Sequence, residues 1–137
     1  MPPDINICLN IYMLKRILSS MNINAETLFR MLADSTRLRT LMLLQAHGEL
    51  CVCELTHALD LSQPKISRHL AHLRESALLL AQRNGQWMYY RINPELPDWA
   101  QAILQHALSG SSGVQPYHRD QQTLKAMPNR PGTACCA

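Results

Sequence analysis

The sequence contains no apolar run of the length that a membrane helix requires. A transmembrane helix needs roughly 18 or more predominantly apolar residues, and no stretch of the 137-residue chain reaches that length. A secretory signal would also need a small-residue cleavage site behind its apolar stretch, but Lys15 and Arg16 stand there instead. We therefore expect a cytoplasmic protein without a membrane partner.

The cysteines lack the spacing of a secreted disulfide scaffold. There are five of them, an odd number, and the adjacent Cys135 and Cys136 have Cα atoms too close together for an ordinary disulfide. Such cysteines stay free thiols in a reducing cytosol, where they can bind metals. Neither a Cys-x-x-Cys motif in a βαβ pattern nor a Cys-x5-Arg phosphate loop is present, so a thiol redox enzyme is the weaker alternative.

The positive charge of the chain is concentrated in one segment. The net charge is only +3, but five basic residues stand between Ser62 and Arg91 against Glu75 as the single acidic one. A local basic surface is the electrostatic footprint of a nucleic-acid-binding protein, although solvated helix faces can give the same count. The composition, 47% hydrophobic and 17% charged, is typical of one small globular domain with tails.

Apolar spacing indicates three short helices in the first half of this domain. Apolar residues recur at helical spacing from about Ala25, and a second run follows Asp34 and Ser35, which can cap its start. The second helix should end near Gly48, because glycine suits a helix C-terminus. A third helix of about two turns is indicated by Val52, Leu55 and Leu59.

A tight turn at residues 60–62 separates the third helix from a fourth. Ser62 can cap the fourth helix, with Pro64 in its first turn. One apolar stripe then runs along three turns, made of Ile66, Leu70, Leu73 and Ala77. Two helices joined by a short turn form the helix-turn-helix motif, in which the second helix enters the major groove of DNA.

A β-hairpin is expected directly after this recognition helix. Residues 78–83 and 86–92 are strand-like, and the Asn84-Gly85 pair between them is a strong hairpin signal, because a type I′ turn requires positive φ at both positions. A hairpin in this position is a wing. The apolar face of a last helix follows, made of Trp99, Ile103, Leu104 and Ala107, before Ser109 to Gly113 break the pattern.

The predicted fold is therefore mainly α with a small β-hairpin, a winged helix-turn-helix. We divide the chain into a leader at 1–24, to which we assign no element, a winged helix-turn-helix domain at 25–108, and a flexible tail with the vicinal cysteine pair at 109–137. Side chains predicted to contact DNA point away from the apolar stripe or lie on the wing, and they are Gln63, Lys65, Ser67, Arg68, His72 and Arg83.

The tripeptide Cys51-Val52-Cys53 precedes the recognition helix and suggests a binding site for a soft ion. Val52 occupies the apolar stripe of its helix, which places the two cysteines about 100° to either side of it. In the first turn of a helix the dipole favours thiolate, and thiolates select soft metals and metalloids. Residues i and i+2 of a continuous helix diverge by about 200°, so we expect ion binding to unwind this turn.

The stretch from Glu49 to Leu73, ELCVCELTHALDLSQPKISRHLAHL, resembles the arsenical-resistance repressor (ArsR) family of winged-helix metalloregulators. The resemblance covers about residues 25 to 108. It implies a DNA-binding homodimer, built through the first and last helices of the domain, that represses its own resistance operon. It also implies release from operator DNA when trivalent arsenic or antimony binds Cys51 and Cys53.

The resemblance leaves the third ligand of the ion open. Members of the family often carry a third cysteine three residues beyond the second, where this sequence has Thr56. A hydroxyl is a poor partner for a soft ion. The remaining candidates are Cys135 or Cys136 from the tail, or a non-protein thiol or hydroxide.

Two other binding functions compete with a metalloid-responsive repressor. Zinc and cadmium sensors of the same superfamily typically carry an Asp-x-His pair on the last helix, but here Ala100 stands two places after Asp98, and His106 is alone. A thiol metal buffer would explain the cysteines but not the recognition helix and wing. Operator binding that is lost on addition of arsenite would separate these alternatives.

Overall fold

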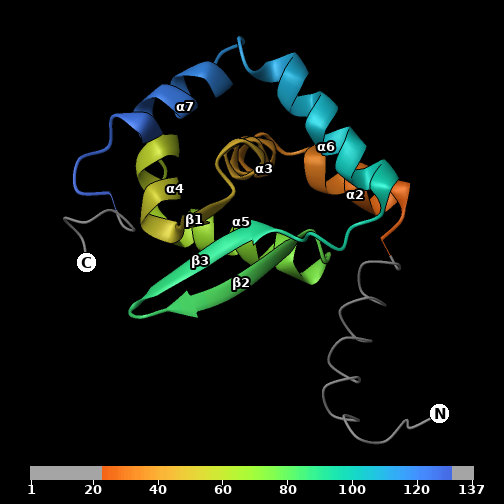
Figure 1. Ribbon diagram of the computed structural model, residues 1–137, viewed down its shortest axis with the longest axis horizontal. Helices are drawn as coiled ribbons and strands as arrows, with labels where there is room; N and C mark the ends of the chain where they lie inside the picture. The colour runs from red at the N-terminus through yellow and green to blue at the C-terminus, as the bar shows by residue number, and fades with distance from the viewer. Residues whose placement is uncertain (1–22, 131–137) are drawn as a thin grey trace, which may run out of the picture.

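The central element of the fold is helix α3 (Ser35–His47), around which the other elements pack (Figure 1). The structure is a computed structural model that describes residues 23–130. Four consecutive residues of α3, Leu41 to Leu44, are buried, as in a helix enclosed by neighbours on all sides. Helix α2 (Ala25–Leu32) precedes α3 and packs against it.

The two predicted caps are confirmed where the structure describes them. Asp34 Oδ2 accepts a hydrogen bond of 3.0 Å from the backbone N–H of Arg37 at the start of α3, and Ser62 Oγ accepts one of 3.4 Å from Lys65 at the start of α5 (Gln63–Glu75). Both contacts satisfy N–H groups that a helix leaves without a partner in its first turn.

The helix-turn-helix motif consists of α4 (Val52–Leu59) and α5. Ile66, Leu70 and Leu73 are fully buried, as the stripe predicted. Ala77 is not part of the stripe, because α5 ends at Glu75 and Ala77 adopts a left-handed conformation with φ of 69°. The backbone N–H of Leu78 donates to the carbonyl of Leu73, and that of Ala77 to Arg74, which is the Schellman pattern of helix ends.

The predicted hairpin is confirmed as strands β2 (Leu79–Asn84) and β3 (Trp87–Ile92). A third strand that we did not predict, β1 (Glu49–Cys51), pairs antiparallel with β3, so the sheet order is β1-β3-β2. Glu49 lies opposite Arg91 and Cys51 opposite Tyr89. Three residues are too few to show a strand period, which is why the sequence pattern did not reveal β1.

The predicted flexible tail is wrong for its first part. Helix α6 (Asp98–Ser111) continues past the predicted boundary at 108, and a further helix, α7 (Tyr117–Lys125), packs on α4 and α3. Its sparse apolar residues gave little periodic signal, yet Leu124 is fully buried. Residues 1–22, most of the predicted leader, and 131–137, which include Cys135 and Cys136, lie outside the described part of the chain.

The face of α6 differs from the predicted one. Leu104 is buried as expected, but Trp99 is 40% exposed, and the buried position beside it is Ala100. Among the described residues, no helix is both long and apolar enough to cross a membrane.

Candidate thiol site and nucleic-acid interface

The sulfur atoms of Cys51 and Cys53 lie 2.8 Å apart, and both cysteines are free. Cys51 is the last residue of β1 and the N-cap of α4, with the extended backbone angles φ −91° and ψ 168°. Because Cys51 is not helical, its side chain does not diverge from that of Cys53 as it would on a continuous helix. The predicted reason for unwinding the first turn is therefore wrong, since the two sulfurs already converge.

The predicted preference of Cys51 for the thiolate form is also wrong. Burial raises the pKa of the Cys51 thiol from its ordinary value of 9.0 to about 12, the hydrogen bond with Cys53 adds to the rise, and the backbone N–H of Glu54 opposes it. Cys51 is only 1% exposed, so desolvation outweighs the helix dipole. At neutral pH Cys51 is a protonated thiol.

A buried carboxylate in the first turn of α4 supports the thiol pair. Glu54 is 2% exposed, and its Oε1 atom accepts a hydrogen bond of 2.9 Å from the backbone N–H of Cys51. The other carboxylate oxygen, Oε2, pairs with Arg130, beyond α7. The sequence analysis missed both residues. The capping-box spacing of Glu54, three residues after the N-cap, was the available signal for one of them.

Thr56 does not offer its hydroxyl to the thiol pair. Its Oγ1 donates a hydrogen bond to the backbone carbonyl of Val52, one turn earlier in α4. Among the described residues, no group of three or more His, Cys, Asp or Glu side chains is placed to hold a metal ion. The described part of the chain therefore provides two sulfur ligands at this site.

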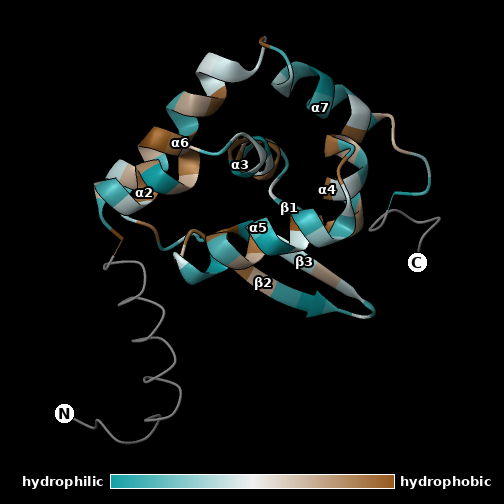
Figure 2. Ribbon diagram, turned by 180° about the vertical axis from the view of Figure 1, so that it is seen from behind, coloured by the Kyte–Doolittle hydropathy of each residue, from teal (hydrophilic) through white to brown (hydrophobic). Residues whose placement is uncertain are grey.

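Helix α5 presents a polar face to solvent opposite its buried stripe, and the hydrophilic far end of the wing is visible in Figure 2. Of the six predicted DNA-contact residues, four are exposed and two are half-buried: Gln63, Arg68, His72 and Arg83 are exposed, and Lys65 and Ser67 are half-buried. Gln63 Nε2 donates to Ser67 Oγ at 2.6 Å, which orients the amide at the start of α5. Contact of these residues with DNA stays a prediction.

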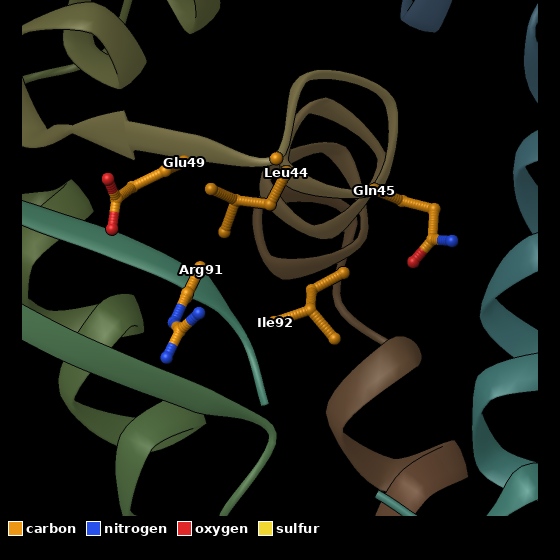
Figure 3. A pocket seen from close by; sticks show the side chains of 6 residues that line it. Leu44, Gln45, Glu49, Arg91 and Ile92 are labelled. Carbon is orange, nitrogen blue, oxygen red and sulfur yellow. The ribbon is translucent and has the colours of Figure 1, made fainter. Parts of the chain in front are cut away.

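A separate hollow of about 400 Å³ lies beside the end of α3 (Figure 3). Glu49 and Arg91, which face each other across β1 and β3, lie on its border, with Leu44, Gln45 and Ile92. Neither Cys51 nor Cys53 lines it. The thiol pair is therefore a site of its own at the junction of sheet and helix.

The helix-turn-helix region matches the family model described as bacterial regulatory protein, arsR family, over residues 34–79. The arsenic resistance transcriptional regulator ArsR1 of Pseudomonas putida is 63% identical over 76 residues, a match that covers 56% of this chain and 59% of that relative. The arsenic resistance transcriptional regulator ArsR2 of the same organism is 49% identical over 116 residues, which covers 83% of this chain and 99% of the relative.

Two solved structures are similar to this chain in fold. HlyU from Vibrio cholerae has a TM-score of 0.57 and 30% identity, covering 64% of this chain and 90% of its own. The AntR antimony-specific transcriptional repressor has a TM-score of 0.54 and 30% identity, covering 67% of this chain and 86% of its own. With a winged helix-turn-helix fold and these relatives, the chain belongs to the arsR family of bacterial regulatory proteins, which regulate transcription and are not enzymes.

Proposed function

We propose that this regulator is a repressor that occupies operator DNA when free and leaves it when trivalent arsenic or antimony binds Cys51 and Cys53. The observation that carries the proposal is the convergence of the two sulfur atoms, 2.8 Å apart, at the junction of β1 and α4. The names of the relatives ArsR1 and ArsR2 support arsenic as the inducer, and that of AntR supports antimony.

The protonated state of Cys51 favours a metalloid over a divalent metal ion. Arsenous acid, As(OH)₃, binds two thiols by exchanging two hydroxyl groups, and each thiol proton leaves with a hydroxyl as water, so no proton or electron is released. Zinc or cadmium would have to expel the thiol protons into solution. Because the pKa of Cys51 is raised to about 12, that expulsion is costly at neutral pH.

Ion binding at this junction can affect both α5 and the wing, which are the two parts of the proposed DNA-binding surface. Cys53 lies in α4, whose buried residues Leu55 and Leu59 belong to the core on which α5 packs. Cys51 ends β1, which pairs with the wing strand β3 opposite Tyr89. An ion that binds better to a shifted junction would favour a conformation that docks poorly on DNA. Allosteric couplings are typically about 1–3 kcal/mol, or about 5- to 150-fold in affinity.

A third ligand from the C-terminal segment fits the position of Arg130. The hydroxyl of Thr56 is bonded to the backbone, so Cys135 or Cys136 is the protein alternative to an external thiol or hydroxide. Arg130 pairs with Glu54 beside the thiol pair, and the five residues from there to Cys135 span at most about 17 Å when extended. We propose Cys135 or Cys136 as the third ligand.

We further propose that the repressor is a homodimer built through α2 and α6. Both helices pack on α3, and each leaves a large aromatic side chain exposed, Phe29 at 53% and Trp99 at 40%. Exposed aromatic rings are enriched at protein interfaces. A dimer would present two α5 helices to two half-sites of an operator.

A DNA-binding titration with several ions tests the proposed function. The protein, bound to a fluorescent fragment of DNA from upstream of its own gene, is titrated with arsenite, antimonite, zinc and cadmium at about pH 6.5 and pH 8. Arsenite or antimonite should release the DNA with little dependence on pH, because the exchange releases no proton. Release by zinc or cadmium at lower concentrations than arsenite would contradict the proposal.

A further inference from the structure

Cys51 and Glu54 hold each other through two hydrogen bonds that run in opposite directions. Glu54 Oε1 accepts a hydrogen bond of 2.9 Å from the backbone N–H of Cys51, and the sulfur of Cys51 accepts one from the backbone N–H of Glu54. This arrangement is the capping box of helix N-termini, with cysteine in the place that serine or threonine usually takes. One sulfur of the thiol pair is therefore also the capping group of α4.

The convergence of the two sulfurs depends on the backbone conformation at Cys51. This residue is extended, with φ −91° and ψ 168°, whereas Cys53 is helical, and the sulfurs lie 2.8 Å apart. If Cys51 joined the helix, the two side chains would diverge by about 200°. Cys51 is also the last residue of β1, where pairing with β3 ends. Strand pairing thus holds it from one side, and Glu54 holds it from the other.

The carboxylate of Glu54 is itself held in place from the C-terminal side of the fold. It is buried, and its second oxygen, Oε2, pairs with Arg130, which follows α7. Helix α7 lies beside α4 (Figure 1) and is anchored to α3, because Arg39 donates to both carboxylate oxygens of Asp120 at 2.8 and 2.7 Å. A buried carboxylate is stable only with such a partner, so Glu54 keeps its charge and its orientation beside the thiol pair.

We propose that Glu54 is a positioning residue of the metalloid site, because its carboxylate holds Cys51 extended and so keeps the two sulfurs together before arsenic binds. This inference rests on the proposed function. Glu54 forms no bond to the arsenic in this role. The two thiols replace two hydroxyl groups of arsenous acid, each thiol proton leaves with a hydroxyl as water, and the arsenic stays trivalent.

The expected size of the effect follows from the freedom that Cys51 would gain without the carboxylate. Its backbone could then adopt conformations in which the sulfurs lie apart, and arsenic would bind only the convergent fraction. The entropy cost of fixing the backbone of one residue corresponds to about 5- to 30-fold in a binding constant. The pairing of β1 with β3 still restrains Cys51. We therefore expect the lower end of this range, a weakening of about fivefold.

The experiment measures arsenite affinity by calorimetry in thiol-free buffer, and stability by urea denaturation, for full-length variants. Glu54→Ala should weaken arsenite binding about fivefold. Glu54→Gln should recover most of the affinity, because its amide oxygen can accept the N–H of Cys51 although the charge is lost. Asp120→Ala loses stability through Arg39 but leaves the contacts between Glu54 and Cys51 in place, so its arsenite affinity should match the wild type.

Three results would overturn the positioning role. One is wild-type affinity in Glu54→Ala, and another is a Glu54→Gln variant that binds as weakly as Glu54→Ala. The third is a weakening in Asp120→Ala as large as that in Glu54→Ala, because affinity would then simply follow stability.

A second variant keeps the test valid if Glu54→Ala fails to fold. Glu54→Leu fills the buried position with an apolar side chain and also removes the acceptor, so it should weaken arsenite binding about fivefold as well. Wild-type affinity in a folded Glu54→Leu variant would overturn the inference. Failure of the proposed function is distinguishable, because the wild-type protein would then bind arsenite no better than a Cys51→Ser/Cys53→Ser variant.

Discussion

Replacing Asp120 by alanine would leave Arg39 without its carboxylate partner in the interior of the protein. The side chains of Asp120 and Arg39 are only 2% and 15% exposed, and two hydrogen bonds join them. Removing one partner of a buried ion pair costs about 3–5 kcal/mol, because the remaining charge stays buried. For a domain of this size, each kcal/mol lowers Tm by roughly 3 °C, so the expected loss is roughly 9–15 °C.

The chain offers a matched exposed ion pair as the control. Glu26 and Arg30 lie 3.9 Å apart on α2, with side chains that are 88% and 62% exposed. Solvent-exposed pairs contribute about 0–1 kcal/mol, so Glu26→Ala should change Tm by only a few degrees. Thermal unfolding followed by circular dichroism compares the two variants. Similar Tm values for Asp120→Ala and Glu26→Ala would refute the argument that α7 is anchored through Arg39.

Three further predictions concern the DNA interface, the end of α5 and the buried thiol. Arg68→Ala should weaken operator binding by about 1–3 kcal/mol without unfolding the protein, measured by fluorescence anisotropy against Arg119→Ala; equal affinities would remove Arg68 from the interface. Ala77→Gly should raise the free energy of unfolding by about 1 kcal/mol, because glycine adopts φ of 69° without strain, and a loss of stability in urea denaturation would contradict this. Folding raises the pKa of Cys51 from 9.0 to about 12, so its contribution to stability is complete below pH 9 and is lost as pH rises from 9 toward 12. The stability difference between wild type and Cys51→Ser should therefore stay constant below about pH 9 and shrink between about pH 9 and pH 12, and a difference that stays constant across that window would contradict the raised pKa.

The elements that could be predicted from the sequence are those whose signals come from neighbouring residues. Asp34 and Ser62 cap helices because their side chains reach the backbone N–H three residues later, and Asn84-Gly85 forms the hairpin turn because of its backbone preferences. The stripe of α5 followed from helical periodicity. These features depend on residues within a few positions of one another, so the winged helix-turn-helix was predictable.

The features that were missed depend on contacts between distant parts of the chain. Strand β1 exists because Glu49 to Cys51 pair with β3, about 40 residues later. That pairing makes Cys51 extended, and the extended backbone brings the two sulfurs together. Helix α7 is fixed by Arg39 and Asp120, which are 81 residues apart. Pairings between such distant residues leave no periodic pattern in the local sequence, so they could not be predicted from it.

The central claim is that Cys51 and Cys53 form the inducer site, and arsenite-dependent release of operator DNA by single cysteine variants tests it most directly. Cys51→Ser and Cys53→Ser should bind operator DNA with near wild-type affinity but stay bound when arsenite is added, because a hydroxyl replaces one sulfur ligand. Cys8→Ser, which changes a cysteine outside the proposed site, should respond as the wild type does. Release of Cys51→Ser or Cys53→Ser from DNA at the wild-type arsenite concentration would contradict the assignment.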